Sequence, residues 1–224
     1  MSDYKVVHGT KVQNFSSDPP APSEGQVWYN TTTNTTKYFF INPGAWSTAN
    51  NLNTSRSALG GAGTKTSALA FAGSPNRTIT ELWNGTNWTE VNDLNTGRTY
   101  LAGCGTNTAA LAFAGNPQID NGALCETWNG TNWTEVNDMT AKRNNPGGLG
   151  TSTAGLAFGG SGDKGNTELW NGTNWTEVAD LAAGRESHAG AGSQTAALAF
   201  GGSSPPGPTE EWNAGPTTST LGSE

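Results

Sequence analysis

Short apolar clusters, separated by glycine-rich and polar segments, recur along most of the chain at a nearly constant interval. One strand-like piece appears four times, as Leu69-Ala70-Phe71, Leu111-Ala112-Phe113, Leu156-Ala157-Phe158 and Leu198-Ala199-Phe200. Its Phe residues are 42, 45 and 42 positions apart. Such a period is typical of repeat folds, in which each unit buries its apolar side against its neighbours.

Tryptophan and arginine keep the same register. A first Trp follows each Phe, a second Trp comes five residues after it in three units, and an Arg comes ten residues after the second Trp. Trp46 precedes Arg56 by the same ten residues. These columns are Trp83, Trp128, Trp170 and Trp212; Trp88, Trp133 and Trp175; and Arg56, Arg98, Arg143 and Arg185.

Each unit predicts four short strands. The first strand is rich in Gly and Ala, as at residues 100–103, and the second ends at a Phe, as at 110–113. The third strand ends at the first Trp, as at 80–83, and the fourth begins at the second Trp, as at 88–91. Asn84-Gly85 between the last two favours a tight hairpin turn. No segment has a sustained helical period, so the sequence predicts an all-β chain.

These marks resemble the kelch family of β-propellers. Arg98, the Ala114-Gly115 pair, Trp128 and Trp133 lie where kelch units carry an Arg, a glycine pair, an aromatic residue and a Trp. The resemblance covers roughly residues 24–213 and implies blades of four antiparallel strands. The period is shorter than the roughly 50 residues of kelch units, and Trp often stands where kelch has Tyr.

Counting back one period indicates a fifth, degenerate unit near residues 25–52. The prediction is therefore a kelch-like propeller of five short four-stranded blades over residues 25–215, with residues 1–24 as a docking arm or closing strand and 216–224 as a flexible tail. Tyr4 to Val12 is the expected closing strand, and Asp18 to Pro22 the expected linker. The alternatives are four blades plus an N-terminal hairpin, and an array that needs further chains to close.

The charge and composition of the chain argue against some classes of binding partner. The 224 residues carry a net charge of −7 and no basic run, which argues against binding nucleic acid. No apolar run approaches the roughly 18 residues of a membrane helix, so no membrane insertion is expected. The N-terminus does not read as a secretion signal, which indicates synthesis in a cytoplasm. The two cysteines, Cys104 and Cys125, are too few for a disulfide framework.

The repeated Trp and Arg residues are interpreted as structural. The Trp columns fill gaps between blades, although exposed rings would also stack on sugars. The Arg column pairs with repeated acids, which are either Glu81, Glu126, Glu168 and Glu210 or Asp93, Asp138 and Asp180. An anion site at the channel mouth is the alternative. Residues that break the repeat are the candidates for binding, namely Gln118, Ile119, Asp120, Trp28 and Tyr29.

No catalytic residue, cofactor or metal site is predicted. His8 and His188 lie far apart in the sequence without a recurring partner, and no CxxC motif exists for zinc. A glycan hydrolase using paired carboxylates is the enzymatic alternative.

The N-terminal segment is similar to the openings of repeat-bearing virion proteins of tailed phages from cyanobacteria and marine bacteria. The pieces that carry this resemblance are Tyr4 to Gly9 and Glu24-Gly25-Gln26-Val27-Trp28-Tyr29-Asn30. It implies a tail-fibre, tail-tip or capsid-decoration protein of the virion, made in the host cytoplasm. The expected partners are other virion proteins, copies of itself and a host-surface glycan; a purely architectural assembly protein is the alternative.

Overall fold

The protein was analysed as a computed structural model, which describes residues 12–41, 44–117, 122–162, 164–203 and 207–214. The described residues form strands, turns and irregular segments and contain no helix, which confirms the predicted all-β class. The chain divides into two compact units, an N-terminal unit, Met1–Thr48, and a repeat unit, Ala49–Glu224.

The N-terminal unit holds one three-stranded sheet. Its strands are β1 (Gln13–Phe15), β2 (Val27–Asn30) and β3 (Thr35–Tyr38). Strand β2 lies in the middle, parallel to β1 and antiparallel to β3. The expected fifth repeat near residues 25–52 therefore does not form a four-stranded antiparallel sheet. Its strands β2 and β3 belong to a three-stranded sheet in which β2 pairs with β1.

A cluster around Asp18 explains this pairing. The carboxylate oxygen Oδ1 of Asp18 accepts hydrogen bonds from the indole Nε1 of Trp28 (3.1 Å) and from Nδ2 of Asn30 (2.9 Å), and Lys37 forms an ion pair with Oδ2 at 2.7 Å. Asp18 thus ties the start of the proline-rich stretch to β2 and β3. The expected linker at residues 18–22 lies within the N-terminal unit. The expected closing strand, residues 4–12, lies outside the described part of the chain except for Val12.

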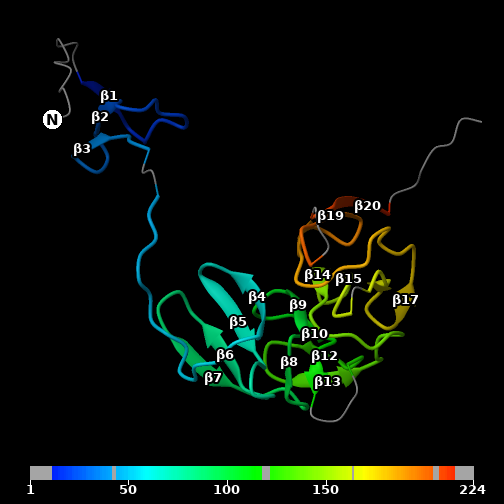
Figure 1. Cartoon of the computed structure of the whole chain (residues 1–224). Coiled ribbons are helices and arrows are strands. Elements are labelled where there is room, and N and C mark those ends of the chain that lie inside the picture. The colour runs from blue at the N-terminus through cyan, green and yellow to red at the C-terminus, as the bar shows by residue number, and fades with distance from the viewer. Residues whose placement is uncertain (1–11, 42–43, 118–121, 163, 204–206, 215–224) are drawn as a thin grey trace, which may run out of the picture. The chain divides into compact units, whose positions relative to one another are not determined.

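The repeat unit contains four sheets that follow one another along the chain (Figure 1). The first sheet is β4 (Gly60–Thr64), β5 (Ser67–Phe71), β6 (Thr80–Trp83) and β7 (Trp88–Val91). The second is β9 (Ala102–Gly105), β10 (Ala110–Phe113), β12 (Cys125–Trp128) and β13 (Trp133–Val136). The third is β14 (Gly147–Gly150), β15 (Gly155–Phe158), β16 (Thr167–Trp170) and β17 (Trp175–Glu177).

The fourth sheet has three strands, β18 (Ala189–Gly192), β19 (Ala196–Phe200) and β20 (Thr209–Asn213). In each of these four sheets every strand pairs antiparallel with the next. A separate short antiparallel pair joins β8 (Arg98–Thr99) to β11 (Asn116–Pro117). The two Trp residues of each complete unit lie opposite each other across the predicted hairpin, as in Trp83 and Trp88.

The core lies between consecutive sheets. All four residues of β10 are buried, because sheets pack against both of its faces. The first strands β4, β9, β14 and β18 pack in succession toward the middle of the repeat unit, and β7, β13 and β17 lie on its outside (Figure 1). Their Gly and Ala residues permit this approach: a Cβ on Gly148 would lie 2.7 Å from Cζ of Phe113 in the second sheet.

Candidate functional site

The Arg column forms buried ion pairs within the repeat unit. Each Arg lies in the segment that enters a sheet and pairs with the Glu of the third strand of that sheet. The pairs are Arg56–Glu81, Arg98–Glu126, Arg143–Glu168 and Arg185–Glu210. Of the two sets of repeated acids that the sequence offers as partners, the structure pairs the arginines with the glutamates.

Each Glu also caps the segment that precedes its Arg. Backbone N–H groups donate to its two carboxylate oxygens, as Asn53 N donates to Oε2 of Glu81 at 2.7 Å and Thr140 N to Oε2 of Glu168 at 2.7 Å. Burial opposes ionisation of Glu81, but Arg56 and the N–H groups of Asn53 and Thr54 together hold the pKa of this carboxyl below its usual 4.5. The repeated charges are therefore used to join each sheet to the segment that enters it.

The second Trp of a unit fills the gap to the preceding sheet. Trp133 packs on Phe71 with ring centroids 4.9 Å apart, and its Nε1 donates to Oγ1 of Thr80 at 3.0 Å. Trp175 packs on Phe113 in the next gap at 5.0 Å. Both rings are buried, whereas Trp88, the equivalent residue of the first unit, is half-buried.

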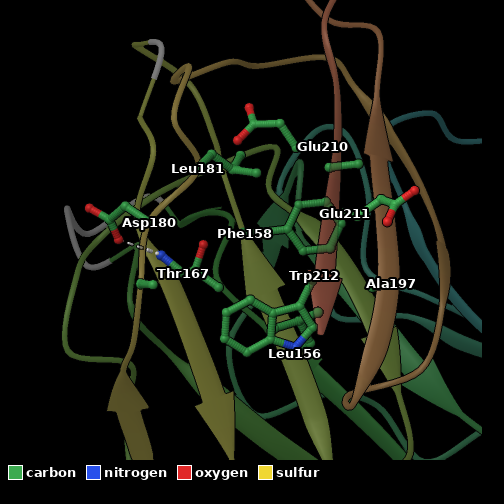
Figure 2. Close-up of a pocket in the computed structure, with 11 residues that line it drawn as sticks. Leu156, Phe158, Thr167, Asp180, Leu181, Ala197, Glu210, Glu211 and Trp212 are labelled. Atoms are coloured by element: carbon green, nitrogen blue, oxygen red, sulfur yellow. Dashed lines mark hydrogen bonds between the residues drawn. The ribbon is translucent and has the colours of Figure 1, made fainter. Parts of the chain in front are cut away.

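The gap between the third and fourth sheets (the third gap) holds a pocket at the place where the first two gaps hold the second Trp of a unit (Figure 2). Leu156, Phe158 and Trp212 form its apolar surface, and Thr167 and Asp180 lie along one side, joined by a 3.1 Å hydrogen bond from the Thr167 backbone N–H to the Asp180 carboxylate. Its volume of about 60 Å³ is far below the roughly 300 Å³ at which small-molecule sites begin. The pocket therefore suits one inserted side chain better than a separate ligand.

The missing ring has a sequence cause. In the last unit Trp212 is followed by Asn213-Ala214-Gly215-Pro216, and Thr217 stands 42 residues after Trp175. The loss of this second Trp is visible in the sequence, but its consequence, a pocket between two sheets, depends on the packing of residues from both units.

Of the sequence-predicted binding residues, the structure describes Trp28 and Tyr29, and both belong to the N-terminal unit. Trp28 is 5% exposed and is held by Asp18, so it serves as a core residue of the N-terminal unit. Tyr29 is half-buried, and its hydroxyl donates to Asn34 at 3.4 Å. Gln118, Ile119 and Asp120 lie outside the described residues.

His188 replaces a leucine in the third gap. It takes the place of Leu101 in the second unit, and its ring lies 5.2 Å from that of Phe158. Burial, and then the positive charge of Arg185, hold the pKa of His188 below its usual 6.5. The unfolded chain therefore binds a proton more readily than the folded chain, and stability should fall as the pH drops through about 6.5.

We expect His188→Leu to reduce the loss of stability between pH 7.5 and 5.5, because leucine has no proton to bind. Urea unfolding midpoints of both proteins at the two pH values would measure this. Equal losses in the variant and the wild type would show that His188 does not carry the pH dependence.

The cysteines are buried free thiols. Cys104 lies on β9 and Cys125 on β12, and burial raises the pKa of both to about 12. Cys125 stands where the first unit has Thr80. The Trp175 indole N–H near Cys125 consequently makes no hydrogen bond of normal geometry, whereas Trp133 bonds to Thr80.

We expect Cys125→Thr to stabilise the protein by about 1 kcal/mol, because threonine would give the buried Trp175 N–H an acceptor. Thr80→Cys is the matched reverse change and should cost about as much. Chemical unfolding of both variants under reducing conditions tests the pair. A destabilised Cys125→Thr together with a neutral Thr80→Cys would contradict the expectation.

No group of His, Cys, Asp and Glu suited to holding a metal ion occurs among the residues that the structure describes. In the same residues no helix is long and apolar enough to cross a membrane. No family model and no curated protein matches this chain. What the chain does must therefore be inferred from its own residues and their arrangement.

Proposed function

We propose that the four sheets of the repeat unit are blades of a kelch-like β-propeller. Two observations support this: each sheet is an antiparallel meander, and the first strands of successive sheets pack against each other. The buried Arg–Glu pairs and the Phe–Trp contacts recur from sheet to sheet. Four blades with a separate N-terminal sheet fit the described strands better than five equal blades.

The function that we propose is that of a structural protein on the surface of a phage virion. The N-terminal unit would dock the chain on the particle, and the repeat unit would present its exposed faces for attachment, with a host-surface glycan as the expected ligand. The observation that carries this is the two-unit layout. The described piece that resembles virion proteins, residues 24–30, contains the central strand β2 of a sheet with its own Asp18 cluster, in a compact unit distinct from the repeats.

The repeat supports a binding role over a catalytic one. Its recurring Arg residues are engaged in buried pairs with Glu, and its hairpin turns expose Asn, Gly and Thr, as at Asn84-Gly85-Thr86. Side chains of this kind bind sugars through hydrogen bonds without a large charge. The exposed turns, more than the Trp columns, are the surface on which a glycan would bind.

Mass spectrometry and cryo-electron microscopy of purified particles from the source of the sequence test the proposal. We expect the chain in the particles, with density for the four sheets at the surface. Asp18→Ala should abolish incorporation by loosening the N-terminal sheet, whereas Glu90→Gln, at an exposed position of β7, should leave it intact. Absence of the wild-type chain from the particles would refute a virion role.

A further inference from the structure

Within the described part of the chain, no fourth strand pairs with the edge of the fourth sheet that carries one in the other three sheets. Strands β7, β13 and β17 each open with a Trp and pair with the third strand of their sheet. Among the described residues, β20 pairs only with β19. Glu210 on β20 consequently keeps 23% of its side chain exposed, whereas those of Glu81 and Glu168 are fully buried.

The pocket beside this edge matches the surroundings of Trp133. The residues that pack with Trp133 in the first gap have counterparts one or more periods later among the pocket residues. In order, Leu69, Phe71, Leu94, Ala110, Ala112 and Trp128 correspond to Leu156, Phe158, Leu181, Ala197, Ala199 and Trp212. Thr167 corresponds to Thr80, which accepts the hydrogen bond of the Trp133 indole. The pocket thus has the lining of a tryptophan site that lacks its ring.

The chain also contains a segment that has the sequence of a fourth strand but pairs with no sheet. Residues 45–56 match residues 87–98 at the Trp, Asn, Leu, Asn, Thr and Arg positions. The later part of this segment is already in place: Nδ2 of Asn50 donates to Oδ1 of Asn87 at 2.7 Å, as Asn137 does to Asn174. Trp46, by contrast, is 104% exposed and lies in no strand.

The two ends of the repeat unit are complementary in a second way. Phe71, Phe113 and Phe158 each pack over a glycine of the following sheet, at Gly103, Gly148 and Gly190. At the fourth sheet Phe200 is 37% exposed. At the other end Gly61, the counterpart of those glycines, has only the backbone oxygen of Leu69 within 4 Å of an added Cβ.

We propose that residues 45–49 of a second copy complete the fourth sheet, with Trp46 filling the pocket and Phe200 packing over Gly61 of that copy. The pattern Trp128 opposite Trp133 then places Trp46 opposite Trp212, and Ser47 opposite Glu211. A second copy is favoured because β4, β9, β14 and β18 pack in one succession, in which β18 and β4 are its two ends. Such a head-to-tail contact either closes into a ring or continues as a filament.

Cysteine trapping tests this contact and identifies the source of the strand. When the Ser47→Cys chain is mixed with the Glu211→Cys chain under mild oxidation, we expect a disulfide-linked pair of chains. Mixing Ser47→Cys with Glu90→Cys, at an exposed position of the first sheet, provides the mismatched control. Failure of the matched mixture to exceed this control would overturn the proposal. A Ser47→Cys/Glu211→Cys double variant that cross-links only within monomers would overturn it as well, by assigning the strand to the same chain.

The oligomeric state provides an independent readout. In sedimentation velocity, we expect Trp46→Ala to weaken self-association at least about tenfold, as for a central aromatic anchor. Gly61→Val should weaken it too, because the added methyl groups would occupy the place of Phe200. Tyr38→Ala removes another exposed aromatic of the N-terminal unit and should leave association unchanged. A wild-type chain that stays monomeric at all concentrations, or equal effects of Trp46→Ala and Tyr38→Ala, would overturn the proposal without bearing on the virion role.

Discussion

Replacing Glu168 with glutamine is expected to destabilise the repeat unit by about 3–5 kcal/mol, the cost of leaving a buried charge without its partner. Glu168 pairs with Arg143, and both side chains are fully buried. Burial already lowers the pKa of Arg143, and the Glu168 charge is the main influence that opposes this shift. Urea unfolding followed by tryptophan fluorescence measures the difference.

The exposed ion pair of the N-terminal unit provides the control. Lys37 and Asp18 keep 34% and 49% of their side chains exposed, so Lys37→Met should cost far less stability than Glu168→Gln. Replacing both Arg143 and Glu168 with apolar residues should recover part of the loss, because no unpaired charge remains. A Glu168→Gln variant as stable as Lys37→Met would mean that the buried pair contributes little.

Replacing Trp133 with alanine is expected to cost about 3–5 kcal/mol, as for other large buried aromatic residues. The change removes the contact with Phe71 and the hydrogen bond to Thr80, and it opens in the first gap the kind of pocket that the third gap already has. Thermal and urea unfolding would measure the loss, and the variant should also become more accessible to small fluorescence quenchers.

Trp46→Ala is the matched control for this prediction. At concentrations low enough to keep the chain monomeric, its stability should equal that of the wild type, because the Trp46 ring is fully exposed. A Trp133→Ala variant that loses no more stability than Trp46→Ala would contradict the packing role of the second Trp column.

The repeated part of the fold could be predicted from the sequence because its signals are local. The period of Phe and Trp predicted the strands of the repeat, and Asn-Gly predicted the hairpin that brings Trp83 opposite Trp88. The rule that a charge repeated in every unit needs a repeated partner predicted acids for the Arg column, but the choice of Glu over Asp comes from the structure. Each of these residues could be assigned a place because equivalent residues in the other units have the same spacing.

The N-terminal sheet could not be predicted in this way. Counting back one period assigned Val27 to Asn30 to a repeat, but the pairing of this strand depends on Asp18 and on a parallel contact with Gln13 to Phe15, which have no repeat equivalents. The candidate pocket was missed for a related reason. The absence of a second Trp in the last unit was evident, but its effect appears only where residues of two consecutive units meet.

Each junction between sheets is built from residues at the same positions of two consecutive units, with Phe71 meeting Trp133 as Phe113 meets Trp175. Each unit therefore carries one surface that contacts the following unit and another that contacts the preceding unit. Duplication or deletion of one whole period in the coding sequence would leave every remaining junction intact. Variation in length by recombination between repeats is thus available to this protein at little structural cost, and related chains are expected to differ by whole units before they differ within them.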